Sequence, residues 1–273
     1  MITMVNKAFY GTLALLFYAG GTVAAAAPQI ELNDIRYPHS NEPIHANSHF
    51  SQQQLHQSLQ KSGNPIDRPA AFDVELYQLD IAVDPHFGTI SGTVTLDLKL
   101  APGAEIIQLD AVDMAIGTVA LDGTETAAFY DGEVLSVALA SPAQGGELVQ
   151  LAIDYEARQP QNLRITGPDA TDPERMIAAY TYTQPLGSRY WFPCLDRPSD
   201  KALAEIRIEV PEGFNALSNG NMIERRRSIT GEVFAYRMDQ PVAPYLMSLA
   251  IGQYEIYNIG SYQGKPLYVW TPE

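Results

Sequence analysis

The sequence contains one cysteine, Cys194, among 273 residues, and it has few basic side chains. A single cysteine excludes an internal disulfide, so the fold must be held together by its hydrophobic core. Lysine and arginine together number 17 against 32 acidic residues, which gives a formal net charge of −15. A surface this acidic repels phosphate groups, so we expect no nucleic-acid partner and no basic patch for anionic lipid.

Several motifs that carry chemistry are absent as well. The sequence has no phosphate-binding loop, no dinucleotide-binding glycine pattern and no GxSxG nucleophile elbow. None of the five histidines stands in an HExxH motif or at zinc-binding distance along the chain from the cysteine. We therefore predict neither a metal site nor a cofactor site in this chain.

The first 27 residues have the pattern of a secretory signal peptide. Lys7 precedes an apolar run, and the alanines at positions 24–26 suit a cleavage site. The alternative is an uncleaved membrane anchor, because residues 8–27 approach the length of a membrane span. We expect export to a periplasm or beyond, with membrane attachment only if the signal is not cleaved. Residues 28–70, rich in Pro, Asn, Ser and Gln, predict a surface arm or linker.

Residues 71–273 are predicted to form one β domain. Apolar and polar residues alternate over 77–83 and 94–100, and the Asp84-Pro85 pair with Gly88 supplies a turn between them. This pattern predicts a β-hairpin with one buried face. The same period of two recurs over residues 135–139, 149–155, 206–210 and 234–238.

One later segment has a different pattern. Residues 245–251 are apolar at nearly every position, which predicts a central strand that is covered on both faces. After Phe72 no helical period persists beyond two turns. The chain therefore predicts an all-β fold, either an antiparallel β-sandwich or a twisted pair of sheets.

The stretch from residue 180 to 202 has an unusual composition. It holds three prolines, three tyrosines, Trp191 and the only cysteine. This density of turn-forming and aromatic residues predicts a long, rigid, packed loop, and such loops on a β scaffold often carry binding residues. The alternative is a packed corner that only holds two sheets together.

Seven residues of this stretch follow the pattern Arg-x-x-Phe-Pro-Cys-x-Asp-x-Pro-x-x-Lys, and Ala202 follows them. They are Arg189, Phe192, Pro193, Cys194, Asp196, Pro198 and Lys201. The pattern resembles a segment in the N-terminal domain of the aminopeptidase N family of zinc metallopeptidases. The hairpin near Tyr77 and the run over 244–254 are also similar to that domain, so the resemblance covers about residues 72–273. It implies a saddle-like N-terminal β domain in which the seven residues build the loop rather than carry chemistry.

The resemblance also assigns a role to Gln184. In the family, a Glu or Gln five residues before the motif's Arg binds the free α-amino group of the substrate, and Gln184 has this position. The α-ammonium group donates hydrogen bonds, and the Gln amide oxygen accepts one. A Glu would bind the amine more tightly, because it adds charge. From its residue type alone, Gln184 would instead be a polar side chain satisfied by the loop backbone.

The family's zinc is held by an HExxH motif and a later Glu, and a Gly-x-Met-Glu-Asn loop grips the amine. Neither motif occurs in this sequence. The resemblance thus implies that zinc belongs to a catalytic domain outside this chain, and that the chain alone is inactive.

Three interpretations stay open. The favoured one is the N-terminal part of an exported zinc aminopeptidase that cleaves N-terminal residues from peptides, with a separate catalytic domain or chain as its partner. The second is a stand-alone exported β-sandwich that binds peptides or a protein without catalysis. The third is a structural surface domain. The favoured interpretation predicts an exposed apolar patch beside the Gln184 loop, where the catalytic domain would dock.

Overall fold

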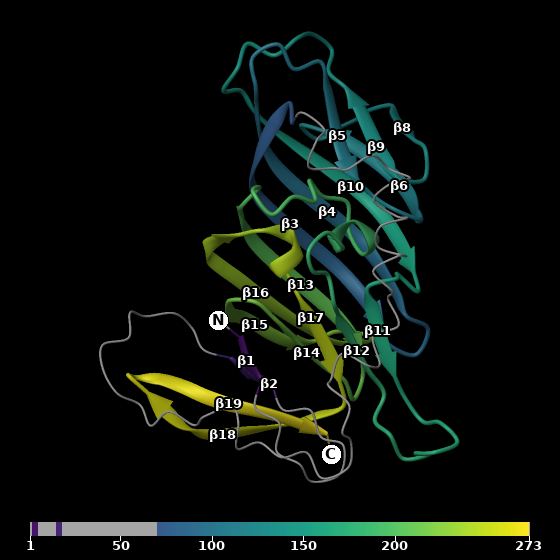
Figure 1. Ribbon diagram of the computed structural model, residues 1–273, viewed down its shortest axis with the longest axis vertical. Coiled ribbons are helices and arrows are strands. Elements are labelled where there is room, and N and C mark those ends of the chain that lie inside the picture. The colour runs from purple at the N-terminus through teal and green to yellow at the C-terminus, as the bar shows by residue number, and fades with distance from the viewer. Residues whose placement is uncertain (1, 5–14, 18–69, 273) are drawn as a thin grey trace. The chain divides into compact units, whose positions relative to one another are not determined.

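A computed structural model describes residues 2–4, 15–17 and 70–272 (Figure 1). The chain divides into two compact units, one holding residues 59–253 and the other holding residues 1–58 and 254–273. Most of the predicted signal peptide and the whole of the predicted linker up to residue 69 lie outside the described residues. Within the described ranges, no helix has both the length and the apolar character needed to cross a membrane.

The unit of residues 59–253 is built on an eight-stranded sheet with the order β15-β16-β13-β3-β4-β10-β6-β7. Figure 1 shows β3, β4 and β10 as its long adjacent strands. The strands are β3 (Phe72–Asp84), β4 (Thr89–Leu100), β6 (Met114–Leu121), β7 (Thr124–Glu125), β10 (Leu148–Arg158), β13 (Ala202–Pro211), β15 (Asn221–Arg227) and β16 (Gly231–Val242).

Two smaller sheets complete this unit. A four-stranded sheet has the order β11-β12-β17-β14, and a three-stranded sheet has the order β5-β9-β8. Their strands are β5 (Ile106–Asp110), β8 (Ala128–Tyr130), β9 (Val134–Ala138), β11 (Leu163–Thr166), β12 (Ala178–Thr181), β14 (Asn215–Ser218) and β17 (Leu249–Gly252). The prediction of an all-β, predominantly antiparallel fold is confirmed.

The predicted hairpin is formed by β3 and β4. Tyr77, Leu79, Ile81 and Val83 all face the core, while the residues between them are partly or fully exposed. Full burial of an apolar side chain contributes about 1.5–3 kcal/mol, so this one face fixes the register of the strand. Gly88 closes the turn at a φ of 66°, and its N–H donates to the Asp84 carbonyl oxygen at 2.8 Å.

One strand pairing was not predicted. β13 pairs with β3 in parallel, with Ile206 opposite Leu79, whereas the other pairings of the eight-stranded sheet are antiparallel. The two strands are separated by more than a hundred residues along the chain, and alternation alone reports a buried face but not its neighbour. The pairing sets the start of β13, and hence the end of the 180–202 stretch, beside β3.

The prediction of a strand over residues 245–251 is wrong in its first half. A 3₁₀ helix occupies Pro244–Leu246, and β17 begins only at Leu249. Pro244 stands in the first turn of this helix, where its fixed φ and missing N–H are tolerated. The second half agrees with the prediction, because β17 lies between β12 and β14 and all four of its residues are buried.

The second unit contains a four-stranded sheet with the order β1-β2-β19-β18. The strands are β1 (Ile2–Met4), β2 (Leu15–Phe17), β18 (Tyr254–Tyr262) and β19 (Lys265–Pro272). Tyr254 and Trp270 are buried and meet edge-on, with ring centroids 6.2 Å apart. The placement of residues 71–273 in one domain stays a prediction.

Candidate functional site

The candidate site is the loop that runs from β12 to β13, residues 182–201. Its first part contains the exposed residues Tyr182, Gln184 and Pro185. From Leu186 to Asp196 every residue is buried, and a 3₁₀ helix covers Ser188–Tyr190. Residues 182–185 therefore form a short, mostly exposed tip of the loop, and residues 186–196 form its long buried base.

Hydrogen bonds fix the tip to neighbouring segments. The Thr183 hydroxyl donates to the Tyr245 carbonyl oxygen at 2.6 Å. Asn162 holds both sides of Gln184, because its carbonyl oxygen accepts from the Tyr182 N–H at 2.8 Å and its side-chain amide donates to the Gly187 carbonyl oxygen at 3.1 Å. The backbone on each side of Gln184 is thereby held by packed neighbours.

The Gln184 side chain itself is exposed, and its peptide bond to Pro185 is cis. No hydrogen bond between described side chains or backbone groups uses its amide. Tyr182 and Leu246 are exposed by 49% and 43%, and the Thr183–Tyr245 hydrogen bond ties the segment that holds Leu246 to the loop. An exposed amide acceptor in a region with exposed apolar side chains suits an uncharged donor or an ammonium group on a partly apolar ligand.

The buried base of the loop is organised around one cation. Arg189 is 3% exposed, and its Nε donates to Asp196 Oδ2 at 2.9 Å. Its Nη1 lies 3.8 Å from Asp110 Oδ1, so a single guanidinium faces two buried carboxylates. Asp110 also accepts the Asp196 backbone N–H at 3.1 Å, and its own backbone pairs with Cys194 in an isolated antiparallel bridge. Removal of the cation would leave two buried negative charges close together.

Burial is the main influence on the pKa values of the acidic groups in this cluster. Burial raises the pKa of Asp196 to about 6, although Arg189 opposes the rise. Burial also raises the pKa of the Cys194 thiol well above its ordinary value, and the nearby Asp196 and Asp110 add to this effect. Cys194 is fully buried, so its thiol is held protonated and does not meet solvent.

Aromatic side chains fill the space between the loop and β3. Phe192 is fully buried and meets Tyr77 edge-on at a centroid distance of 5.7 Å and Trp191 at 4.3 Å. The Tyr77 hydroxyl accepts the Leu195 N–H at 3.1 Å and donates to Asp200 Oδ2 at 3.5 Å. These contacts join the loop to the long hairpin of the eight-stranded sheet.

The remaining motif residues lie at the end of the loop. Pro193 is buried and Pro198 is partly exposed. Lys201 is exposed, and no ion pair links it to a carboxylate within the described ranges. The structure thus gathers Arg189, Phe192, Pro193, Cys194 and Asp196 in one buried cluster and leaves Lys201 outside it.

Sequence reasoning missed four residues of this site, which are Tyr77, Asp110, Asn162 and Asp200. Tyr77, Asp110 and Asn162 are brought to the loop by the fold, whereas Asp200 is a loop residue whose burial the sequence does not reveal. Asp110 resembles any other carboxylate in an acidic sequence. The end of a strand is the available signal for Asp110, because β5 ends there and its carboxylate turns inward.

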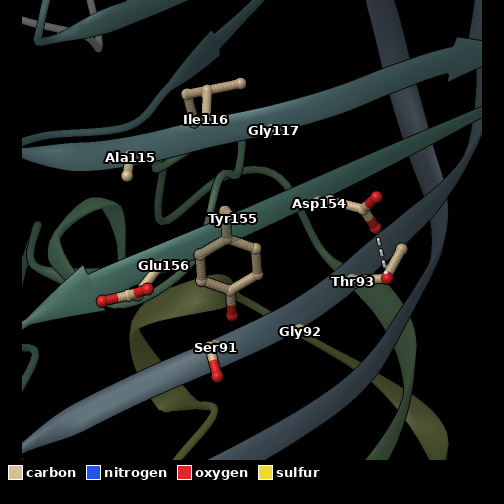
Figure 2. Close-up of a pocket in the computed structure, with 9 residues that line it drawn as sticks. All are labelled: Ser91, Gly92, Thr93, Ala115, Ile116, Gly117, Asp154, Tyr155 and Glu156. Carbon is tan, nitrogen blue, oxygen red and sulfur yellow. Dashed lines mark hydrogen bonds between the residues drawn. The ribbon is translucent and has the colours of Figure 1, made fainter.

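Away from the loop, a hollow of about 420 Å³ lies over β4, β6 and β10. Figure 2 shows Asp154 reaching across to Thr93, whose hydroxyl donates to its Oδ1 at 2.6 Å. The small residues Gly92, Ala115 and Gly117 line the hollow, and none of the predicted site residues does. Metal binding is not indicated either, because no group of three or more His, Cys, Asp or Glu side chains in the described ranges could hold an ion.

Comparison with known sequences gives one consistent result. A profile of the Peptidase M1 N-terminal domain matches residues 74–246. Aminopeptidase B of Homo sapiens is 30% identical over 215 residues, which cover 70% of this chain and 33% of that protein. Aminopeptidase M1 of Arabidopsis thaliana is 24% identical over 191 residues, which cover 66% of this chain and 22% of that protein. The chain spans a third or less of the length of these relatives.

Comparison with solved structures supports the same fold. A mutant M1 zinc metallopeptidase from Deinococcus radiodurans, bound to a Tyr-Ser-Ala substrate, matches with a TM-score of 0.62 and 24% identity. The match covers 71% of this chain and 45% of that one. Native yeast LTA4 hydrolase matches with a TM-score of 0.59 and 22% identity over 70% of this chain and 30% of that one. At these identities the likeness concerns the fold alone.

Proposed function

The chain belongs to the peptidase M1 family as its N-terminal domain, and from this premise we propose that it forms one wall of a peptide-binding cleft, with Gln184 as the acceptor for the substrate's α-amino group. In this proposal the enzyme is an exported zinc aminopeptidase that removes N-terminal residues from peptides. The catalytic zinc domain, in the same polypeptide or in a separate chain, docks beside the Gln184 loop.

The observation that carries the proposal is the contrast between Gln184 and the residues that follow it. Gln184 is exposed and none of its described neighbours hydrogen-bonds to its amide, whereas residues 186–196 are buried and held by an ion cluster. Because the backbone around Gln184 is fixed, ligand binding orders only the side chain and costs only its rotamer freedom. Exposed apolar side chains in the two hydrogen-bonded segments, Tyr182 and Leu246, support a docking surface in this region.

The net charge of the chain also favours a ligand with a positively charged amino group. The formal net charge of −15 attracts a cationic peptide N-terminus and repels anionic ligands. The amide oxygen of Gln184 then accepts one N–H of the ammonium group, and the remaining donors must find acceptors on the catalytic partner. The described residues provide no metal-binding group, so we assign no step of zinc chemistry to this chain.

Export is proposed from the sequence of residues 1–27 alone. A fusion of these residues to a periplasmic reporter tests it, with Lys7→Glu and a charged residue in the apolar run as disabled controls. Retention of the reporter inside the cell would refute export.

The decisive experiment combines the chain with a zinc partner. The DNA downstream of codon 273 and the neighbouring genes are searched for HExxH, and the encoded domain is co-expressed with this chain. We expect hydrolysis of aminoacyl anilides that a chelator abolishes and that N-acetylated substrates do not show. The chain purified alone should show no such hydrolysis.

Gln184 is then tested in the assembled enzyme. Gln184→Ala should raise KM about tenfold, since one hydrogen bond to a charged group contributes roughly 1.5 kcal/mol or more, and Gln184→Glu should lower it. Gln144→Ala, at an exposed glutamine in another loop, is the matched control and should leave KM unchanged. An unchanged KM in Gln184→Ala would refute the assigned contact, and the absence of any HExxH partner would favour a binding module without catalysis.

A further inference from the structure

Asp200 is a buried carboxylate without an ion pair in the described ranges. Its side chain lies at the end of the Gln184 loop and is 6% exposed. Its hydrogen-bond donors are the Tyr77 hydroxyl, at 3.5 Å, and a backbone N–H of Val74. A buried carboxylate with so little compensation tends to bind a proton rather than stay charged.

The ionisable groups that face Asp200 come from β3 and from the loop. Asp73 on β3 is exposed and repels a negative charge on Asp200, whereas Arg197 in the loop stabilises it. Cys194 is also near, and its own pKa is raised in part by Asp200. Burial, followed by Asp73, raises the pKa of Asp200 to about 7, against the opposing effects of the Val74 N–H, Arg197 and Tyr77.

Tyr77 connects Asp200 to the buried base of the loop. Burial raises the pKa of Tyr77 well above its ordinary value, so the hydroxyl keeps its proton. It donates that proton toward Asp200 and accepts the Leu195 N–H at 3.1 Å. Leu195 lies between Cys194 and Asp196, both of which are tied to Asp110. A chain of hydrogen bonds therefore runs from Asp200 through Tyr77 to the backbone that carries the ion cluster.

We infer that Asp200 is a proton-binding site that couples pH to the order of the Gln184 loop. With the proton bound, the loop stays packed on β3; loss of the proton places an uncompensated charge in the interior and favours local opening. A consequence for peptide binding rests on the proposed function of Gln184, whereas the order of the loop does not.

The direction and size of the pH effect on loop opening follow from the coupling between proton binding and opening. In the closed loop Asp200 holds its proton more tightly than in an opened, solvated loop, where its pKa returns to about 3.9. Opening therefore becomes easier as the pH rises between about 4 and 7, and it levels off above the closed-state value. Between pH 6 and pH 8 the opening equilibrium should rise about tenfold.

Hydrogen–deuterium exchange of the 273-residue chain at pH 6, 7 and 8, corrected for intrinsic exchange rates, tests the inference without substrate. Peptides covering residues 186–196 should lose at least about tenfold in protection from pH 6 to pH 8 in the native chain, and Asp200→Asn should reduce this loss to about twofold, which is the share that Asp196, with its pKa of about 6, contributes above pH 6. A flat profile in the native chain, or an unchanged dependence in Asp200→Asn, would overturn the inference.

Two further variants keep the test sharp if Asp200→Asn does not fold. Asp73→Asn removes the repelling charge and lowers the pKa of Asp200, so opening should level off at a lower pH and the change from pH 6 to pH 8 should fall below tenfold. Glu125→Gln, at an exposed carboxylate on the edge strand β7, should behave as the native chain. Identical profiles for Asp73→Asn and Glu125→Gln would also contradict the inference. No arm depends on amine binding, so failure here leaves the proposed function untouched.

Discussion

The exposed tip of the Gln184 loop and its buried base differ in what surrounds their polar side chains. At the tip, Gln184 is open to solvent and finds no partner among the described residues. In the base, Arg189 is enclosed with Asp110 and Asp196. An open polar group is available for a ligand, whereas an enclosed one is committed to the fold. The comparison separates a residue proposed to bind from the residues that hold it in place.

The largest expected effect comes from the base. Arg189→Ala removes the guanidinium that faces both Asp110 and Asp196 and leaves their two buried carboxylates close together without it. We expect a loss of about 3–5 kcal/mol in the free energy of unfolding, measured by urea denaturation.

Arg237→Ala is the matched control for this change. Arg237 is half exposed and pairs with Glu205 at 2.9 Å on the sheet surface, so its loss should cost about 0–1 kcal/mol. Equal losses in the free energy of unfolding for Arg189→Ala and Arg237→Ala would show that the buried cluster stabilises the fold no more than a surface ion pair does.

Gly187 lies at the start of the buried base, next to the tip. A Cβ at this position would stand 1.9 Å from Asn162 Nδ2 and 3.0 Å from the Thr183 backbone. Gly187→Ala must therefore displace Asn162 and weaken its bond to the Gly187 carbonyl oxygen, at a cost of about 1–3 kcal/mol in thermal or urea denaturation.

Gly167→Ala is the control for the boundary, because the nearest atom to its Cβ would be in the Ile177 side chain at 3.6 Å. We expect the free energy of unfolding of Gly167→Ala to differ little from that of the native chain. Equal changes at positions 187 and 167 would mean that the loop adapts freely and that its tip is not fixed by Asn162.

The sequence predicts the strands of this fold better than the contacts between distant strands, and the reason is physical. Alternation along a strand reveals its buried face, which suffices for the β3–β4 hairpin and the all-β class. It does not reveal which distant strands meet, so the parallel pairing of β13 with β3 and the arrival of Tyr77 under the loop stayed unpredicted. The run over 245–251 misled because Pro244 starts a 3₁₀ turn whose residues are as apolar as those of a strand.

Gln184 and the motif residues were predicted from family resemblance rather than from periodicity. The motif points to Arg189 and Asp196, but the second carboxylate, Asp110, comes from a strand outside it. Its role depends on burial beside a cation, a property that appears only when the chain is folded.

The smallest expected effect comes from the tip. Gln184→Ala removes an exposed amide that bonds to no described residue, so the free energy of unfolding should change by less than about 0.5 kcal/mol in urea denaturation. Gln144→Ala should give a change of the same size, since it is another exposed loop glutamine. A loss above about 1 kcal/mol at position 184 alone would show that the amide supports the fold. A near-zero loss in stability, together with a raised KM in the assembled enzyme, would be the signature of a residue whose partner is the substrate.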